Sequence, residues 1–111
     1  MSFLNELESR LLEAIDRTLL ILGEVSKRLI YEHIERTHGV SWMEVPRRLD
    51  ALNEAFLSLM GPSAKGVIEE TIAQRLYDSL GLEFKRREGW FLKEYVDEAR
   101  RMVVGERVEE G

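Results

Sequence analysis

Apolar side chains recur every three or four positions along most of the chain, which is the period of amphipathic helices. The first such stretch covers residues 3–22, where Ser2 can cap the start and Gly23 can end the helix. Its apolar positions are Phe3, Leu4, Leu7, Leu11, Leu12, Ile15, Leu19 and Leu22. A second helix is predicted over residues 24–38, ended by Gly39, with an apolar side formed by Val25, Leu29, Ile30 and Ile34.

The next segment begins with a short turn. Ser41 and Glu44 have the spacing of a capping box, and Pro46 follows so soon that we expect one turn and then a new helix. That third helix is predicted over residues 46–60, with inward positions Leu49, Leu52, Phe56 and Leu59. A fourth is predicted over residues 62–80, and its apolar positions cover more than half of its circumference. A helix of this kind is usually central in its bundle.

The C-terminal third is less regular. Residues 82–86 alternate apolar and polar side chains, Glu88 and Gly89 can turn the chain, and residues 90–92 are apolar again. This pattern over residues 82–92 predicts either a short hairpin or an irregular loop. A last helix is expected over residues 92–104, followed by an acidic, flexible tail at 105–111. The pattern as a whole predicts an all-α fold, an irregular bundle of four to five helices in one domain of residues 1–104.

Composition narrows the class of protein. The 111 residues include no cysteine, which excludes a disulfide framework, and carry a net charge of −5, which disfavours general binding to phosphate backbones. No apolar run reaches the ~20 residues that span a bilayer, and the first residues do not resemble a signal peptide, so we expect a cytoplasmic protein without membrane contact. Scarce amides with abundant Glu and Arg are typical of thermophile proteins.

Few residues suggest a chemistry. His33 and His38 are the only histidines, and their spacing of five predicts that they point in different directions on a helix and share no metal. Glu35 and His38 could share one, but no third ligand is evident, so we predict no metal and no cofactor. For His33 a neutral, hydrogen-bonded core position is favoured. No serine, histidine and acid set stands out, and the sequence predicts no catalytic residue and no enzyme.

Two features of the fourth helix have competing interpretations. The segment from Gly61 to Gly66 lacks the Gly-Lys-Ser/Thr of a phosphate loop, although the amides of a helix start can hold an anion. Gly66 costs about 1 kcal/mol relative to alanine inside a helix, which favours close packing of a neighbouring helix there. Arg75 flanks an apolar face, where it either extends outward to solvent or pairs with a carboxylate.

The densest basic cluster is Lys85, Arg86 and Arg87, next to Trp90 and Phe91. A solvated turn is the favoured interpretation. The alternative is a winged-helix-like DNA-binding protein that places these cations at the tip of a basic hairpin. We expect the exposed side of the preceding helix, with Glu69, Glu70 and Asp78, to oppose phosphates, so no nucleic acid is expected as a partner.

Several landmarks together resemble a known family. They are Leu22-Gly23-Glu24, Tyr31-x-His33-Ile34, Gly39-Val40, the Phe56 to Ala64 run with Gly61, Leu76-Tyr77 and Leu80-Gly81-Leu82. Over residues 11–96 the chain is similar to the small archaeal Nitrosopumilus output domain of the fifth type. The resemblance implies a helical domain found alone or as the end module of archaeal signalling and regulatory proteins, with no site residues to transfer.

The sequence therefore favours a non-catalytic protein-interaction or regulatory module. Leu19, Leu20, Ile21 and Leu22 are four consecutive apolar residues, and at 100° per residue they cannot all face one groove of the same chain. Some must meet a second core layer or another chain. Because two-fold homodimers are the commonest oligomers, we predict a homodimer with Leu20 and Ile21 at its interface, and another protein as a further partner.

Overall fold

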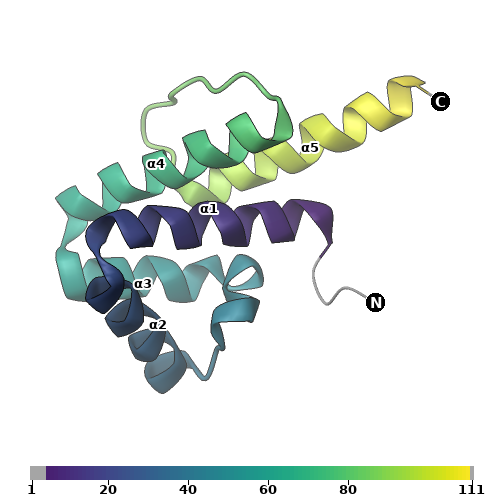
Figure 1. Ribbon diagram of the computed structural model, residues 1–111. Helices are drawn as coiled ribbons and strands as arrows, with labels where there is room; N and C mark the ends of the chain where they lie inside the picture. The colour runs from purple at the N-terminus through teal and green to yellow at the C-terminus, as the bar shows by residue number, and fades with distance from the viewer. Residues whose placement is uncertain (1–4, 111) are drawn as a thin grey trace.

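The computed structural model describes residues 5–110, with side chains for residues 5–104 (Figure 1). Five α-helices and one 3₁₀ helix follow one another along the chain, and residues 5–110 contain no strand. The helices are α1 (Glu6–Leu22), α2 (Glu24–His38), η1 (Trp42–Arg47), α3 (Leu49–Met60), α4 (Pro62–Leu80) and α5 (Leu92–Glu110). The predicted all-α bundle is confirmed.

The first helix begins at Glu6 because Asn5 caps it. The Asn5 side chain accepts a hydrogen bond from the Glu8 amide at 2.8 Å, and the Glu8 carboxylate accepts one from the Asn5 amide at 3.1 Å. This reciprocal pair is a capping box, which satisfies two amide donors at the helix start. The predicted cap Ser2 and the apolar positions Phe3 and Leu4 lie outside the described residues.

The second helix has the predicted bounds, and Gly39 ends it in the left-handed conformation with φ 67°. Its predicted apolar side is wrong in part, because Val25 and Leu29 are exposed and only Ile30 and Ile34 are buried. Figure 1 gives the reason: α2 turns away from the long axis of α1 and extends from the bundle, so only a narrow strip of it meets α1 and α3.

The third α-helix starts later than predicted. Ser41 and Glu44 do form the predicted capping box, but the turn they start continues as η1 through Pro46 to Arg47. Consequently α3 begins at Leu49 rather than at residue 46. Leu52 and Phe56 are buried as predicted, whereas Leu59 is 47% exposed, which corrects its assignment to the inward face.

The fourth helix is central, as its apolar circumference predicted, and α1, α3 and α5 all pack against it. It ends at Gly81, and the loop 82–91 then returns over α4, so that α5 runs in the same general direction (Figure 1). No hairpin forms in this loop. An aromatic cluster of Tyr77, Phe84, Trp90 and Tyr95 holds it on α4 and α5 instead. α5 continues past the predicted end at residue 104 to Glu110.

Candidate functional site

A groove of about 780 Å³ lies where α3 and α5 pack on α4 without packing closely on each other. One wall is a stripe of α3 and the end of η1, and the other is a stripe of α5. The apolar lining consists of Pro46, Leu49, Leu57, Pro62, Phe91, Leu92 and Val96. A mostly apolar cavity of this size with a few polar groups is a typical binding site for a small molecule.

A buried ion pair on α4 forms part of the groove lining. The Lys65 ammonium lies 3.4 Å from a carboxylate oxygen of Glu69, and each side chain is only about 5% exposed or less. The other Glu69 oxygen accepts a hydrogen bond from the Leu92 amide at 2.8 Å, which ties α4 to the start of α5. The predicted exposure of Glu69 is therefore wrong, because α5 covers this side of α4.

The Phe91 ring lies against the buried ammonium of Lys65. The Lys65 nitrogen lies 3.6 Å from the centre of the Phe91 ring, a favourable cation–π geometry. Phe91 itself remains 53% exposed. Its ring thus links the buried cation to the open surface of the groove.

Most charged side chains on the groove walls are paired within the chain, whereas the exposed Arg100 forms no ion pair among the described residues. Glu8 accepts two hydrogen bonds from Arg47, at 2.9 and 3.0 Å, and the Arg47 guanidinium holds the pKa of Glu8 below its ordinary value. Asp50 pairs with Arg48 at 3.0 Å, and Asp97 with Lys93 at 3.3 Å. Glu94 caps α5 by accepting a hydrogen bond from the Phe91 amide at 2.7 Å.

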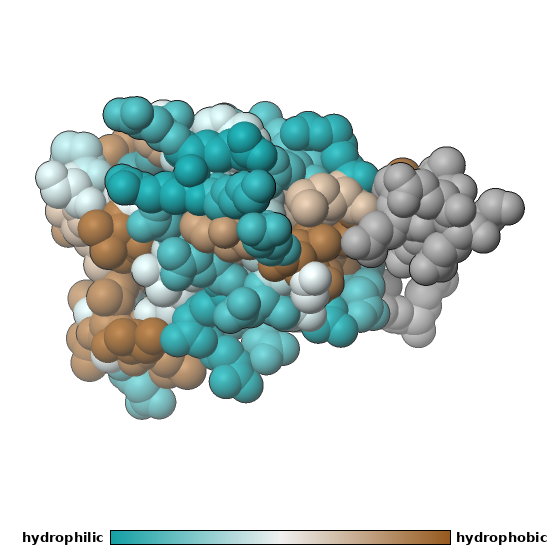
Figure 2. Space-filling view, turned by 90° about the horizontal axis from the view of Figure 1, so that it is seen from above, coloured by the Kyte–Doolittle hydropathy of each residue, from teal (hydrophilic) through white to brown (hydrophobic). Residues whose placement is uncertain are grey.

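A second candidate surface is an exposed apolar end, defined here by Leu20, Ile21, Leu22, Val25, Leu59 and Val67. Their exposed fractions run from 39% for Leu22 to 67% for Val67. These residues flank the α1–α2 and α3–α4 junctions, which lie at the same end of the molecule in Figure 1. Figure 2 shows hydrophobic surface gathered at that end, opposite the grey atoms.

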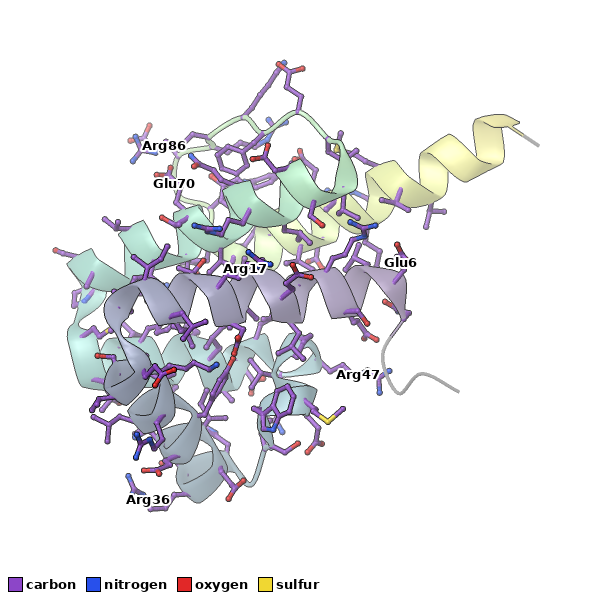
Figure 3. All side chains as sticks on the ribbon, viewed as in Figure 1. Glu6, Arg17, Arg36, Arg47, Glu70 and Arg86 are labelled. Atoms are coloured by element: carbon purple, nitrogen blue, oxygen red, sulfur yellow. The ribbon has the colours of Figure 1, made fainter. Side chains whose placement is uncertain are left out.

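The basic cluster lies on the loop 82–91, and two of its three cations are paired. Arg86 contacts Glu70 at 2.8 Å, as the labelled side chains in Figure 3 illustrate. Arg87 contacts Glu98 at 2.9 Å and lies 5.0 Å from the Trp90 ring. The cluster is thus mainly engaged in holding the loop to α4 and α5.

His33 and His38 both contact one oxygen of Glu54 on α3, at 3.0 and 2.8 Å. The prediction that they point in different directions is therefore wrong. His33 is part-buried and hydrogen-bonded. Ser58 donates to the other Glu54 oxygen, and this bond and those of His38 and His33 lower the Glu54 pKa to about 2.

This serine, acid and histidine set has the wrong order for nucleophilic catalysis. A nucleophilic serine is activated by a hydrogen bond to a histidine, which an acid orients in turn. Here the Ser58 hydroxyl and both imidazoles all meet the carboxylate of Glu54. Within residues 5–104 no group of three or more His, Asp or Glu side chains is placed to hold a metal ion.

Gly66 differs from what its position suggested, whereas Arg75 fits one of its two interpretations. A Cβ atom added at Gly66 would meet nothing within 4 Å, so the predicted close approach of another helix is wrong. Arg75 forms no ion pair among the described residues, and its buried Nε has no hydrogen-bond partner there. This favours the interpretation in which its side chain extends along the apolar face toward solvent.

Comparisons with known proteins found no matching family model, curated protein or solved structure. The resemblance to the archaeal output domain therefore stays a prediction. Across the described residues, none of the helices is long and apolar enough to cross a membrane.

The main feature that the sequence left unassigned is the Lys65–Glu69 pair. Its only signal was the spacing of four on a helix, next to the inward positions Ile68 and Ile72. Such spacing usually marks a solvated surface pair. The burial of the pair depends on where the loop 82–91 places α5, which no local pattern shows.

Proposed function

We propose that this protein is a non-catalytic interaction module that associates with a second copy of itself through the apolar end. The observation that carries the proposal is the exposure of Leu20 and Ile21, at 41% and 66%. They lie on the face of α1 opposite the buried Leu11, Ile15 and Leu19, so the fold of one chain leaves them uncovered. Contiguous exposed apolar surface usually marks an interaction site.

A regulatory role fits this arrangement. The carboxylates described here are engaged in ion pairs, helix caps and the Glu54 cluster, which supports binding rather than catalysis. The resemblance to an archaeal signalling family supports the same proposal, as does the expectation of a cytoplasmic protein.

The DNA-binding alternative has less support. Its wing would require a hairpin at residues 82–92, and its cations would need to be available to phosphates. The loop has no strand, and Arg86 and Arg87 pair with Glu70 and Glu98. Neutralised cations contribute little to phosphate binding.

Sedimentation equilibrium at micromolar concentration tests the proposal. We expect a dimer for the natural chain, and a monomer of 12.9 kDa for Leu20→Glu and Ile21→Glu. Val104→Glu is the matched control, because Val104 is 53% exposed but lies on the C-terminal part of α5, which extends away from the apolar end in Figure 1. A natural chain that sediments as a monomer would refute self-association. A dimer that persists in both variants would place the interface elsewhere.

A further inference from the structure

We propose that the groove between α3 and α5 binds a small amphipathic carboxylate, with the carboxylate at Lys65 and the apolar body along the walls. This site is separate from the apolar end and does not depend on self-association. The proposal rests on the buried cation, on two helix starts that converge there, and on the pairing of the wall carboxylates Glu8, Asp50 and Asp97.

The buried ammonium has capacity for another acceptor. A lysine ammonium has three N–H donors, whereas the contacts of Lys65 with described residues are one carboxylate oxygen at 3.4 Å and the Phe91 ring. Charge-assisted N–H···O bonds are typically about 2.7–2.9 Å long, so the contact with Glu69 is a loose one. Because Glu69 also binds the Leu92 amide, it is held toward α5 rather than fully on the ammonium.

The start of two helices adds to the attraction for an anion. Pro62 is the first residue of α4 and Leu92 the first of α5, and both line the groove beside Lys65. Helix N-termini carry partial positive charge, equivalent to roughly half an elementary charge each. The amides of Phe91 and Leu92 at the start of α5 are already bound by Glu94 and Glu69. The ammonium and the start of α4 therefore supply the main attraction for a further anionic group.

The walls of the groove favour an apolar molecule with a single charged group over a charged peptide. The carboxylates of Glu8, Asp50 and Asp97 are paired with arginine or lysine of this chain. A partner helix would gain specificity from unpaired charges along both walls. The groove offers instead an apolar lining with the buried cation Lys65 and with the exposed cation Arg100, which forms no ion pair among the described residues. Its volume lies in the range of small-molecule sites, about 300–1,000 Å³.

Decanoate is a suitable probe, with decan-1-ol as its uncharged counterpart. We expect isothermal titration calorimetry to give one decanoate per chain with a Kd below about 1 mM, and at least tenfold weaker binding of decanol. Lys65→Met should weaken the binding of decanoate at least tenfold. Since this change leaves Glu69 buried without its partner, the double variant Lys65→Met with Glu69→Gln serves as a second test in case the single variant fails to fold. The side-chain oxygen of the glutamine that replaces Glu69 can still accept a hydrogen bond from the Leu92 amide.

Matched controls locate the site. Lys85→Met removes an exposed lysine on the loop and should leave decanoate binding unchanged. Leu57 and Leu59 are both exposed on α3, at 44% and 47%, but only Leu57 lines the groove. Leu57→Asn should therefore weaken binding several-fold, and Leu59→Asn should not. No binding below about 1 mM, equal binding of decanol, or binding unaffected by the double variant would each overturn the proposal.

Discussion

Arg47 holds Glu8 through two hydrogen bonds of 2.9 and 3.0 Å, although the two residues are 39 positions apart. Glu8 also completes the cap of α1, so one carboxylate joins the start of the first helix to the end of η1. The Glu8 side chain is only 9% exposed. A carboxylate used in this way must stay ionised, which makes it a source of acid sensitivity.

The first prediction concerns Glu8→Gln. Glutamine keeps the capping box but loses the charged pair with Arg47, so we expect the free energy of unfolding at pH 7 to fall by about 1 kcal/mol. Folding holds the Glu8 pKa below its ordinary 4.5, so this stabilisation is complete above pH 4.5 and is lost as the pH falls through the lowered folded value. Urea unfolding at pH 7, 5, 4 and 3 should show that the gap in the free energy of unfolding between the variant and the natural chain closes as the pH falls. A gap that stays constant across this range would contradict the prediction.

The second prediction concerns Glu54, whose pKa of about 2 lies well below the ordinary 4.5. Its contribution to stability should be complete above pH 4.5 and should disappear between pH 4.5 and about 2. Glu54→Gln should therefore lower the free energy of unfolding at neutral pH. It should also make this free energy less sensitive to acid between pH 4.5 and about 2. Glu35→Gln, an exposed change on α2, is the control. If both variants show the same pH profile, the cluster around Glu54 does not hold α2 to α3.

The pattern of apolar residues predicted the helices well, because each end carries its own local signal. Gly39 and Gly81 both adopt the left-handed conformation that a helix end requires, and each ends the helix where expected. The start of α3 was missed because Pro46 suits both a 3₁₀ turn and the first turn of an α-helix.

The groove could not be predicted, because its parts come from four separate segments. Glu69 was expected on the exposed side of its helix with Glu70 and Asp78, and only the return of the loop 82–91 brings α5 over it. The meeting of His33 and His38 at Glu54 has the same cause, since α3 supplies the acceptor that the spacing on α2 cannot reveal. Long-range placement, rather than local propensity, decides both clusters.

The third prediction follows from the open surroundings of Gly66. Alanine there adds a Cβ that meets nothing within 4 Å and removes the entropic cost of an interior glycine. We expect Gly66→Ala to stabilise the protein by about 0.5–1 kcal/mol in thermal unfolding. Gly39→Ala is the opposite case, because its φ of 67° costs a non-glycine residue about 1–2 kcal/mol. A loss of stability in Gly66→Ala would show that the residue has a packing partner after all.

The last prediction separates two roles for the basic cluster. Arg87 contacts Glu98 at 2.9 Å and the Trp90 ring, and its backbone amide donates to the Tyr95 hydroxyl at 2.9 Å. Glu98 also accepts a hydrogen bond from Tyr77, so removing Arg87 leaves a largely covered carboxylate with one partner fewer. We therefore expect Arg87→Ala to lower the free energy of unfolding by about 1–2 kcal/mol, and Lys85→Ala to change it by less than about 0.5 kcal/mol.

The same two variants test nucleic-acid binding. If the cluster served phosphates, Lys85 and Arg87 would contribute comparably, since each cation releases about one counterion on binding. Fluorescence anisotropy with a labelled random duplex at 150 mM salt should show no binding for the natural chain or for either variant. Tight binding that Lys85→Ala weakens, without any change in its stability, would establish the loop as a phosphate contact and revive the DNA-binding alternative.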